Sequence, residues 1–300
     1  MTRHSTKFSV SFLRHLLTLI VLLVLTGCDY SFTQNQSTLD PKGPLAQDAY
    51  NVMGYTLYVT LFLFITVGGT LLYTLWRYRK RKSDPPDFRP KQSHGNPLVE
   101  VGLIITSALM LVVIGVPTVQ GIANMHNIPE STPDKEILEI NVTGHQWWWE
   151  FEYPQLGIVT ANEMVIPTGE QVVINLRSAD VNHSFWLPKM AGKTDLIPGQ
   201  ENRMWIQADE SGKYWGQCAE FCGDSHAYML FRAFAKPRKE FDQWVVNQKS
   251  DSDIREAEHL THGKELFAEK GCNGCHMIDG QGGVIAPNLS HFGKRSSLAA

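Results

Sequence analysis

Residues 218–229 gather side chains that bind soft metal ions, namely Cys218, Cys222, His226 and Met229. Two thiolates, an imidazole and a thioether suit copper better than calcium or magnesium. Zinc would accept two sulfurs and a nitrogen, but methionine is a poor zinc ligand, and a structural zinc site would require a fourth cysteine or histidine. The structural alternative is a disulfide formed in an oxidising compartment, which would leave His226 and Met229 unexplained. The pattern favours copper.

A second motif lies close to the end of the sequence, where Cys272, Cys275 and His276 form a Cys-x-x-Cys-His pattern. In c-type haem proteins two such cysteines attach the haem through thioether bonds, and the histidine binds the iron. Met277 directly follows His276 and cannot reach the opposite haem face. We expect the sequence to be truncated within this module. Its last residues, about 50 in number, should be poorly packed because so short a segment buries little surface.

The elements that must position these motifs begin with an apolar stretch at the N-terminus. Residues 1–27 start with basic side chains, continue through an apolar run and end in Thr26 and Gly27, which is typical of a secretory signal. Cys28 follows directly and resembles the acylated cysteine of a bacterial lipoprotein, and Asp29 resembles a Gram-negative inner-membrane retention signal. The alternative is an uncleaved helix with a chance cysteine at its end.

Two further apolar stretches are long enough to span a membrane. Residues 49–76 and 101–125 contain no charged side chain, and a membrane core of about 30 Å needs roughly 20 apolar helical residues. We predict spans over about 50–76 and 101–124. The loop 77–97 carries seven basic residues against Asp84 and Asp87, a net charge of +5. The positive-inside rule therefore places this loop in the cytoplasm and everything after about residue 125 outside.

The pattern changes to short β-rich runs from residue 137 onward. Turn formers separate the predicted strands, and helical signals are weak until Glu240, so we predict an all-β sandwich of about 100 residues. The predicted strands cover residues 137–142, 146–153, 171–177, 203–207, 213–216 and 229–235. The chain has a net charge of −3, with −9 in residues 92–300. This acidity argues against a nucleic-acid binder and attracts basic partners, or simply keeps the exported part soluble.

These motifs together resemble cytochrome c oxidase subunit 2, over roughly residues 45–245. The resemblance includes His183 and the run from Gly144 to Trp149. It implies that Cys218 and Cys222 bridge two coppers. His183 and Met229 would complete one copper, and His226 with the backbone carbonyl of Glu220 the other.

Three further roles follow from the resemblance alone. The Glu220 carboxylate would also reach a magnesium or manganese ion at the boundary with the catalytic subunit, and a hard carboxylate is the appropriate ligand. Trp147 would be the aromatic residue through which electrons enter, although a tryptophan in a strand can simply pack in the core. Glu100 would begin a proton path, or lie at the membrane interface without a task. Leu103 departs from the usual tryptophan three residues after that glutamate.

The sequence therefore predicts a multi-domain membrane protein. Its parts are a lipoprotein-type signal peptide (1–27), a two-helix transmembrane hairpin (28–125), an all-β cupredoxin-like sandwich with the binuclear copper (126–245), a linker (246–258) and a partial all-α cytochrome c domain (259–300). A subunit 2 fused to a cytochrome c resembles the caa-type oxidases. We expect one covalent haem c, with the copper and haem domains on the outer face of a bacterial plasma membrane.

The predicted function is electron entry into a proton-pumping oxidase that reduces oxygen to water in a partner subunit. The expected partners are the catalytic subunit, other oxidase subunits, cytochrome c as donor and the membrane, with no nucleic acid. The alternatives are a quinol oxidase subunit without copper, a copper-delivery lipoprotein and nitrous oxide reductase. The five donor residues argue against the first, the haem motif against the second, and the absence of a large histidine-rich domain in this sequence against the third.

Overall fold

The computed structural model describes residues 14–15, 18–19, 33–81, 83–89, 94–250 and 258–297. Residues 1–34 form one unit and residues 35–300 a second. Residues 14, 15, 18 and 19 are helical. Cys28 and most of the predicted signal peptide lie outside the described residues, and the following paragraphs concern the second unit.

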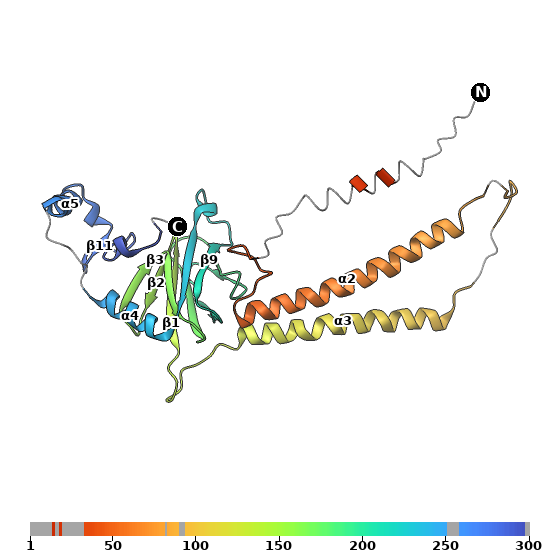
Figure 1. Ribbon diagram of the computed structural model, residues 1–300, viewed down its shortest axis with the longest axis horizontal. Coiled ribbons are helices and arrows are strands. Elements are labelled where there is room, and N and C mark those ends of the chain that lie inside the picture. The colour runs from red at the N-terminus through yellow and green to blue at the C-terminus, as the bar shows by residue number, and fades with distance from the viewer. Residues whose placement is uncertain are drawn as a thin grey trace, which may run out of the picture. The chain divides into compact units, whose positions relative to one another are not determined.

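Helices α2 (Pro44–Arg77) and α3 (Pro97–His126) lie side by side as a hairpin (Figure 1). Each begins with a proline, whose fixed φ suits the first helical position, and the Asn96 side chain accepts a hydrogen bond from the Leu98 amide. Both helices are long and apolar enough to cross a membrane. They extend beyond the predicted spans of 50–76 and 101–124, because the helical hydrogen bonding continues past the apolar residues at both ends of each helix. Helix α3 continues through Pro117.

Two five-stranded sheets form the sandwich. The first has the order β3-β2-β1-β5-β8, from β3 (Ile158–Ala161), β2 (Trp148–Tyr153), β1 (Leu138–His145), β5 (Val172–Ser178) and β8 (Asn202–Ile206). The second has the order β4-β10-β9-β6-β7, from β4 (Glu163–Pro167), β10 (Leu230–Lys236), β9 (Gly212–Cys218), β6 (His183–Trp186) and β7 (Lys193–Leu196). Pairs β1–β5 and β4–β10 are parallel, and the other pairs are antiparallel.

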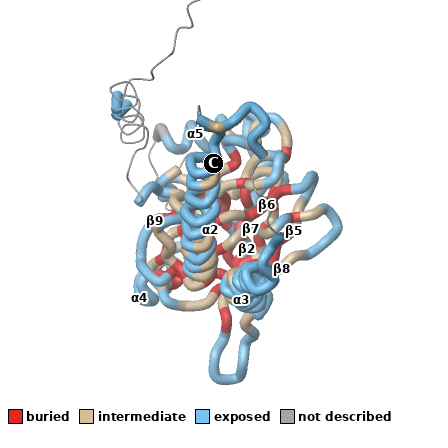
Figure 2. The backbone as a smooth tube through the Cα atoms, turned by 90° about the vertical axis from the view of Figure 1, so that its right-hand side faces the viewer, coloured by how far each residue is buried: buried red, intermediate tan, exposed pale blue. Residues whose placement is uncertain are grey.

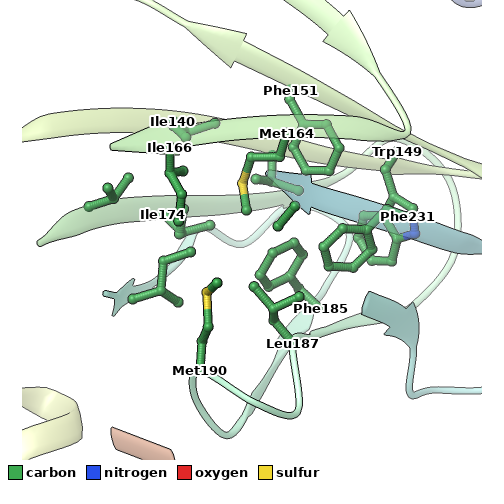
Figure 3. Close-up of a cluster of buried hydrophobic side chains, with 14 of the residues drawn as sticks. Ile140, Trp149, Phe151, Met164, Ile166, Ile174, Phe185, Leu187, Met190 and Phe231 are labelled. Carbon is green, nitrogen blue, oxygen red and sulfur yellow. The ribbon is translucent and has the colours of Figure 1, made fainter. Parts of the chain in front are cut away.

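The core lies between the sheets, where buried residues gather (Figure 2). Alternate residues of β1 are buried, as expected for a strand with one face on a core. Phe185 and Phe231 stack with ring centroids 4.6 Å apart. Trp149 meets them edge-on at 5.7 and 5.5 Å (Figure 3). This aromatic group joins the two sheets next to the strand ends that carry the candidate metal ligands.

All six predicted strands are present, with ends that shift by no more than three residues. Sequence patterning missed the short strands β3, β4, β6 and β7. Helix α4 (Arg238–Lys249) begins close to Glu240, as expected; its Trp244 packs against Tyr153 of the sandwich, and the buried Phe241 contacts Trp244. It continues four residues into the predicted linker 246–258, because the apolar face that starts at Phe241 extends to Trp244 and Val245 and the last turn follows from them. Residues 251–257 lie outside the described residues.

The C-terminal segment has much less regular structure. It contains α5 (Glu258–Glu269), the short helices η2 (Cys272–Gly274) and η3 (Phe292–Lys294), and the two-residue strands β11 (Met277–Ile278) and β12 (Gln281–Gly282). None of residues 260–297 is buried, which agrees with the expected poor packing. Gly271 has a φ of +72° between α5 and η2, a left-handed conformation that favours glycine.

Candidate metal centre

The predicted soft donors converge at one end of the second sheet. His183 begins β6, Cys218 ends β9, and the other three donors lie on the loop that leads into β10. The backbone pairing of Phe185 with Cys218 brings β6 beside β9. Met229, although it lies at the end of that loop, is completely buried.

Distances between the donor atoms are short. Cys218 Sγ lies 3.8 Å from Cys222 Sγ, 3.9 Å from His183 Nδ1 and 3.2 Å from the backbone oxygen of Glu220. Cys222 Sγ lies 3.6 Å from His226 Nδ1 and 3.7 Å from Met229 Sδ. Donor atoms of His183, Cys218 and Cys222 all lie within 4.8 Å of one another, and the three residues are buried.

Asp180 fixes the orientation of the His183 ring. Its Oδ1 lies 2.7 Å from His183 Nε2, which leaves Nδ1 toward the sulfurs, as metal-binding histidines commonly have their other nitrogen held by a carboxylate. Gly144 allows the ring to approach the backbone of β1, because a Cβ there would lie 2.8 Å from His183 Cδ2. Asp180 also accepts the amide hydrogen of Gln146 at 2.7 Å.

The two thiols have different protonation properties. Burial raises the pKa of Cys218. Hydrogen bonds from His183 and from the backbone of Ser184 outweigh the effect of burial and lower the pKa of Cys218 to about 6. Burial and the negative charge of the Cys218 thiolate raise the pKa of Cys222. Buried negative charge is costly without a counter-charge. A cation between the sulfurs would supply that counter-charge and displace the second proton.

This donor set fits two soft metal ions better than one. Two sulfurs, two imidazole nitrogens, a thioether and a carbonyl oxygen offer six donors, whereas a single structural zinc uses four. None of the six is a carboxylate, which argues against a calcium or magnesium site among these atoms. The Glu220 side chain is exposed, so only its backbone belongs to this cluster.

Residues of the β1–β2 turn hold the metal-binding loop. Trp147 Nε1 and Gln146 Nε2 both donate hydrogen bonds to the Cys222 carbonyl, at 3.1 and 2.8 Å. Gly223 has a φ of +114° and packs against both side chains, where another residue would be strained. Trp147 is half-buried, so its indole reaches from a candidate ligand to the surface.

The haem-type motif forms a separate site. Cys272 and Cys275 are free thiols, and His276 Nδ1 lies 2.8 Å from the Pro287 carbonyl, which leaves Nε2 as the metal-binding atom. A cavity of about 710 Å³ reaches the motif at Asn273, and its lining includes apolar side chains such as Phe267, Ile278 and Leu289 as well as polar ones such as Lys264 and Asp279. A free thiol pair, an oriented histidine and a neighbouring cavity with several apolar side chains fit a covalently bound haem.

The structure does not bring Glu100 to either site. Glu100 lies in the first turn of α3, and the other end of that helix leads into the sandwich. Sequence reasoning assigned no role to Asp180 or Gly144. The spacing of Asp180 three residues before a candidate histidine ligand is a usable signal, whereas the need for glycine at residue 144 depends on contact between strands that are distant in sequence.

A β-sandwich with a buried cluster of soft donors, joined to two membrane-type helices, defines a membrane-anchored cupredoxin-like protein. Residues 156–233 match the family described as cytochrome c oxidase subunit II, periplasmic domain. Residues 34–120 match the transmembrane domain of the same subunit, and residues 260–300 match cytochrome c. The chain belongs to the cytochrome c oxidase subunit II family, with a cytochrome c region at its C-terminal side, and is a subunit of a terminal oxidase with a periplasmic domain.

The sequence is similar to named proteins over most of its length. Cytochrome c oxidase subunit 2 of Alkalihalophilus pseudofirmus is 38% identical, over 92% of this chain and 80% of the relative. The protein of the same name in Bacillus subtilis is 33% identical, over 95% of this chain and 83% of the relative. Quinol oxidase subunit 2 of Bacillus spizizenii is 34% identical, over 78% of this chain and 71% of the relative. The family thus includes subunits named for two different electron donors.

Proposed function

We propose that this chain is the electron-entry subunit of a cytochrome c oxidase, accepting electrons through a c-type haem and a binuclear copper centre. The observation that carries this proposal is the convergence of the sulfurs of Cys218 and Cys222 with His183, His226 and Met229. Two coppers sharing both thiolates would delocalise one electron, so that reduction changes little geometry. The role of this chain is then to hold the donors rigidly, which the surrounding strands and Asp180 favour.

The quinol oxidase alternative has support from relatives that are 34% identical. A quinol oxidase subunit has no use for the buried donors or for a haem motif. Here, five donors face one another within 3.9 Å of a neighbouring donor, and residues 260–300 match cytochrome c. Both features favour the cytochrome c branch. They also argue against a copper-delivery lipoprotein, which would bind one labile copper and need no haem.

Three residue roles belong to the same proposal. Trp147 is the entry point for electrons, supported by its hydrogen bond to the Cys222 carbonyl. The exposed Glu220 carboxylate binds a magnesium or manganese ion together with groups from the catalytic subunit. Cys28 is lipidated, which is the third role. The chain lies in a bacterial plasma membrane, and its partners are the catalytic subunit, the other oxidase subunits and cytochrome c.

Electron paramagnetic resonance of the purified oxidase tests the copper assignment. We expect two coppers per chain and the signal of one electron shared between them. Cys218→Ser should abolish that signal, because a hydroxyl cannot replace a bridging thiolate. Cys272→Ser, which removes a thiol outside the centre, is the matched control and should leave the signal intact. A single copper per chain, or a shared-electron signal that survives in Cys218→Ser, would contradict the proposal.

Glu100 is proposed to begin a proton path from the cytoplasmic side, because an ionisable group at this membrane boundary has few structural tasks. Glu100→Gln keeps the size of the side chain and removes its charge. We expect slower turnover and a lower ratio of pumped protons to electrons, measured in vesicles. Unchanged turnover and pumping would reduce Glu100 to an interfacial residue.

A further inference from the structure

A chain of four charged side chains links the segment before α2 to the sandwich. Lys189 Nζ lies 2.7 Å from Asp40 Oδ2, and Lys42 Nζ lies 3.4 Å from Asp40 Oδ1. Lys42 Nζ also lies 3.0 Å from Glu210 Oε2. Exposed ion pairs contribute little, but Lys189 is only 9% exposed. A buried ammonium depends on its counter-charge, so the pair with Asp40 is the important one.

Backbone hydrogen bonds follow the same path. The Lys42 amide donates to the Lys189 carbonyl at 2.6 Å, and the Ala46 amide donates to the Met190 carbonyl at 3.1 Å. The Lys42 carbonyl accepts from the Asp209 amide at 2.8 Å. Residues 40–46, which we call the strap, are therefore bonded to two loops of the sandwich.

The strap fits closely against those loops. A Cβ on Gly43 would overlap the Gln207 carbonyl oxygen and would lie 2.9 Å from the Met190 oxygen. Leu45 and Ala46 are buried, and Leu45 belongs to the hydrophobic core of the sandwich. The first turn of a membrane-type helix is thus built into the β domain.

One of the two loops continues directly from the strand that carries a proposed copper ligand. Strand β6 begins with His183 and ends at Trp186, and the loop of residues 187–192 follows at once. At the same end of the hairpin, Trp205 Nε1 donates to the Asn124 carbonyl near the end of α3 at 3.0 Å. Both helices are therefore hydrogen-bonded to the sandwich, and α2 is bonded through the continuation of β6.

We infer that Asp40 and Lys189 are positioning residues, which hold the ligand-bearing strand β6 in a fixed place relative to the membrane spans. This inference rests on the proposed electron-entry function. The rate of electron transfer falls steeply with distance, so the distance between the donor cluster and the catalytic subunit must be held constant. The strap lies outside the donor set, so loosening it changes that distance without changing the donors.

Asp40→Asn in the complete oxidase in lipid nanodiscs tests the inference. Hydrogen exchange of residues 37–46 and 187–192 should become about tenfold faster or more, as expected for easier local opening. Electron transfer from the copper to the catalytic subunit, followed after flash reduction, should slow severalfold. The copper resonance signal and reduction potential should stay unchanged. Glu170→Gln, which removes an exposed pair with Arg238 at 3.1 Å, is the matched control and should change none of these quantities.

Unchanged exchange or an unchanged transfer rate in Asp40→Asn would overturn the inference, as would a shifted copper potential that explains the slower rate. If the variant does not assemble, exchange in the wild-type oxidase decides. The amides of Lys42 and Ala46 should then exchange at the same rate as those of residues 187–192. They should exchange more slowly than the exposed turn of residues 132–135, which hydrogen bonds between Thr132 and Lys135 close. Independent opening of the strap and residues 187–192 would overturn the inference. A wild-type oxidase without the shared-electron signal would remove the proposed function and leave the exchange result standing.

Discussion

The donor cluster of the sandwich and the haem-type motif position their ligands in different ways. In the sandwich, strands β6 and β9 hold His183 and Cys218 next to a completely buried aromatic core. In the C-terminal segment, none of residues 260–297 is buried, and a cavity of about 710 Å³ reaches the haem-type motif at Asn273. The first site is shaped by the core of the polypeptide. The second needs the group that it binds to complete its core.

Replacing a large apolar side chain by alanine should give the largest difference in stability between the sandwich and the C-terminal segment. Phe231 is completely buried and contacts Phe185 and Trp149, so Phe231→Ala should destabilise the sandwich by about 3–5 kcal/mol. Phe267 is only half-buried and lines the C-terminal cavity. Phe267→Ala should therefore cost little in the haem-free chain and more in the haem-loaded one. Denaturant unfolding of both variants, with and without haem, measures the difference.

Phe231→Leu is the control for loss of the aromatic ring at nearly constant volume and should cost less than the alanine variant. Equal losses for Phe231→Ala and Phe267→Ala in the haem-free chain would contradict the contrast between a complete core and an incomplete one.

Sequence periodicity identified six strands of this core because each alternates or runs apolar over several residues. It missed β3, β4, β6 and β7, which have four or five residues and show little of a period of two, whereas β8, also of five residues, carries an apolar run. The omission of β6 is instructive, since His183 was assigned by its resemblance to a family motif and its strand was not recognised. The sequence identified His183 as a candidate ligand, whereas it did not predict the strand that holds this residue.

The support of the donors depends on contacts between distant segments. Gly144 and His183 are 39 positions apart in sequence and meet only because β1 and β6 face each other across the sandwich. The hydrogen bond from Trp147 to the Cys222 carbonyl likewise joins two loops. Trp147 was assigned a role by resemblance, but neither its bond to Cys222 nor the contact of Gly144 with His183 follows from residue type, so composition and spacing could predict the ligands but not the geometry around them.

The groups that orient the histidines extend the same comparison. Asp180 holds His183 through a side chain, and the Pro287 backbone carbonyl holds His276. Asp180→Asn should therefore weaken copper binding about 10–100-fold, a typical loss when a group behind a metal ligand is changed. The pKa of Asp180 is lowered because its hydrogen bonds with His183 and backbone amides outweigh burial. The carboxylate is thus charged at neutral pH, and the amide removes a full charge. Competition titration with a copper chelator gives the affinity.

Asp195→Asn is the matched control, because Asp195 lies opposite Ser184 on the neighbouring strand β7 and is exposed. It should keep normal copper affinity. If both variants bind copper normally, the orientation of His183 does not depend on Asp180, and the packing of Gly144 against the ring is the stronger constraint.

Trp147 offers the smallest and most specific change. Trp147→Phe removes one neutral hydrogen bond to the Cys222 carbonyl, worth about 1 kcal/mol, and Gln146 still donates to the same oxygen at 2.8 Å. The copper spectrum should therefore stay unchanged while electron arrival at copper slows, as measured by stopped-flow mixing with reduced cytochrome c. Trp148→Phe is the control, because the Trp148 ring stacks on His145 with ring centroids 4.2 Å apart and, among the described residues, its side chain makes no hydrogen bond to the metal-binding loop. Equal slowing in both variants would show that electrons do not depend on the contact with Cys222, and the rigid sandwich would then supply the ligands but not the entry route.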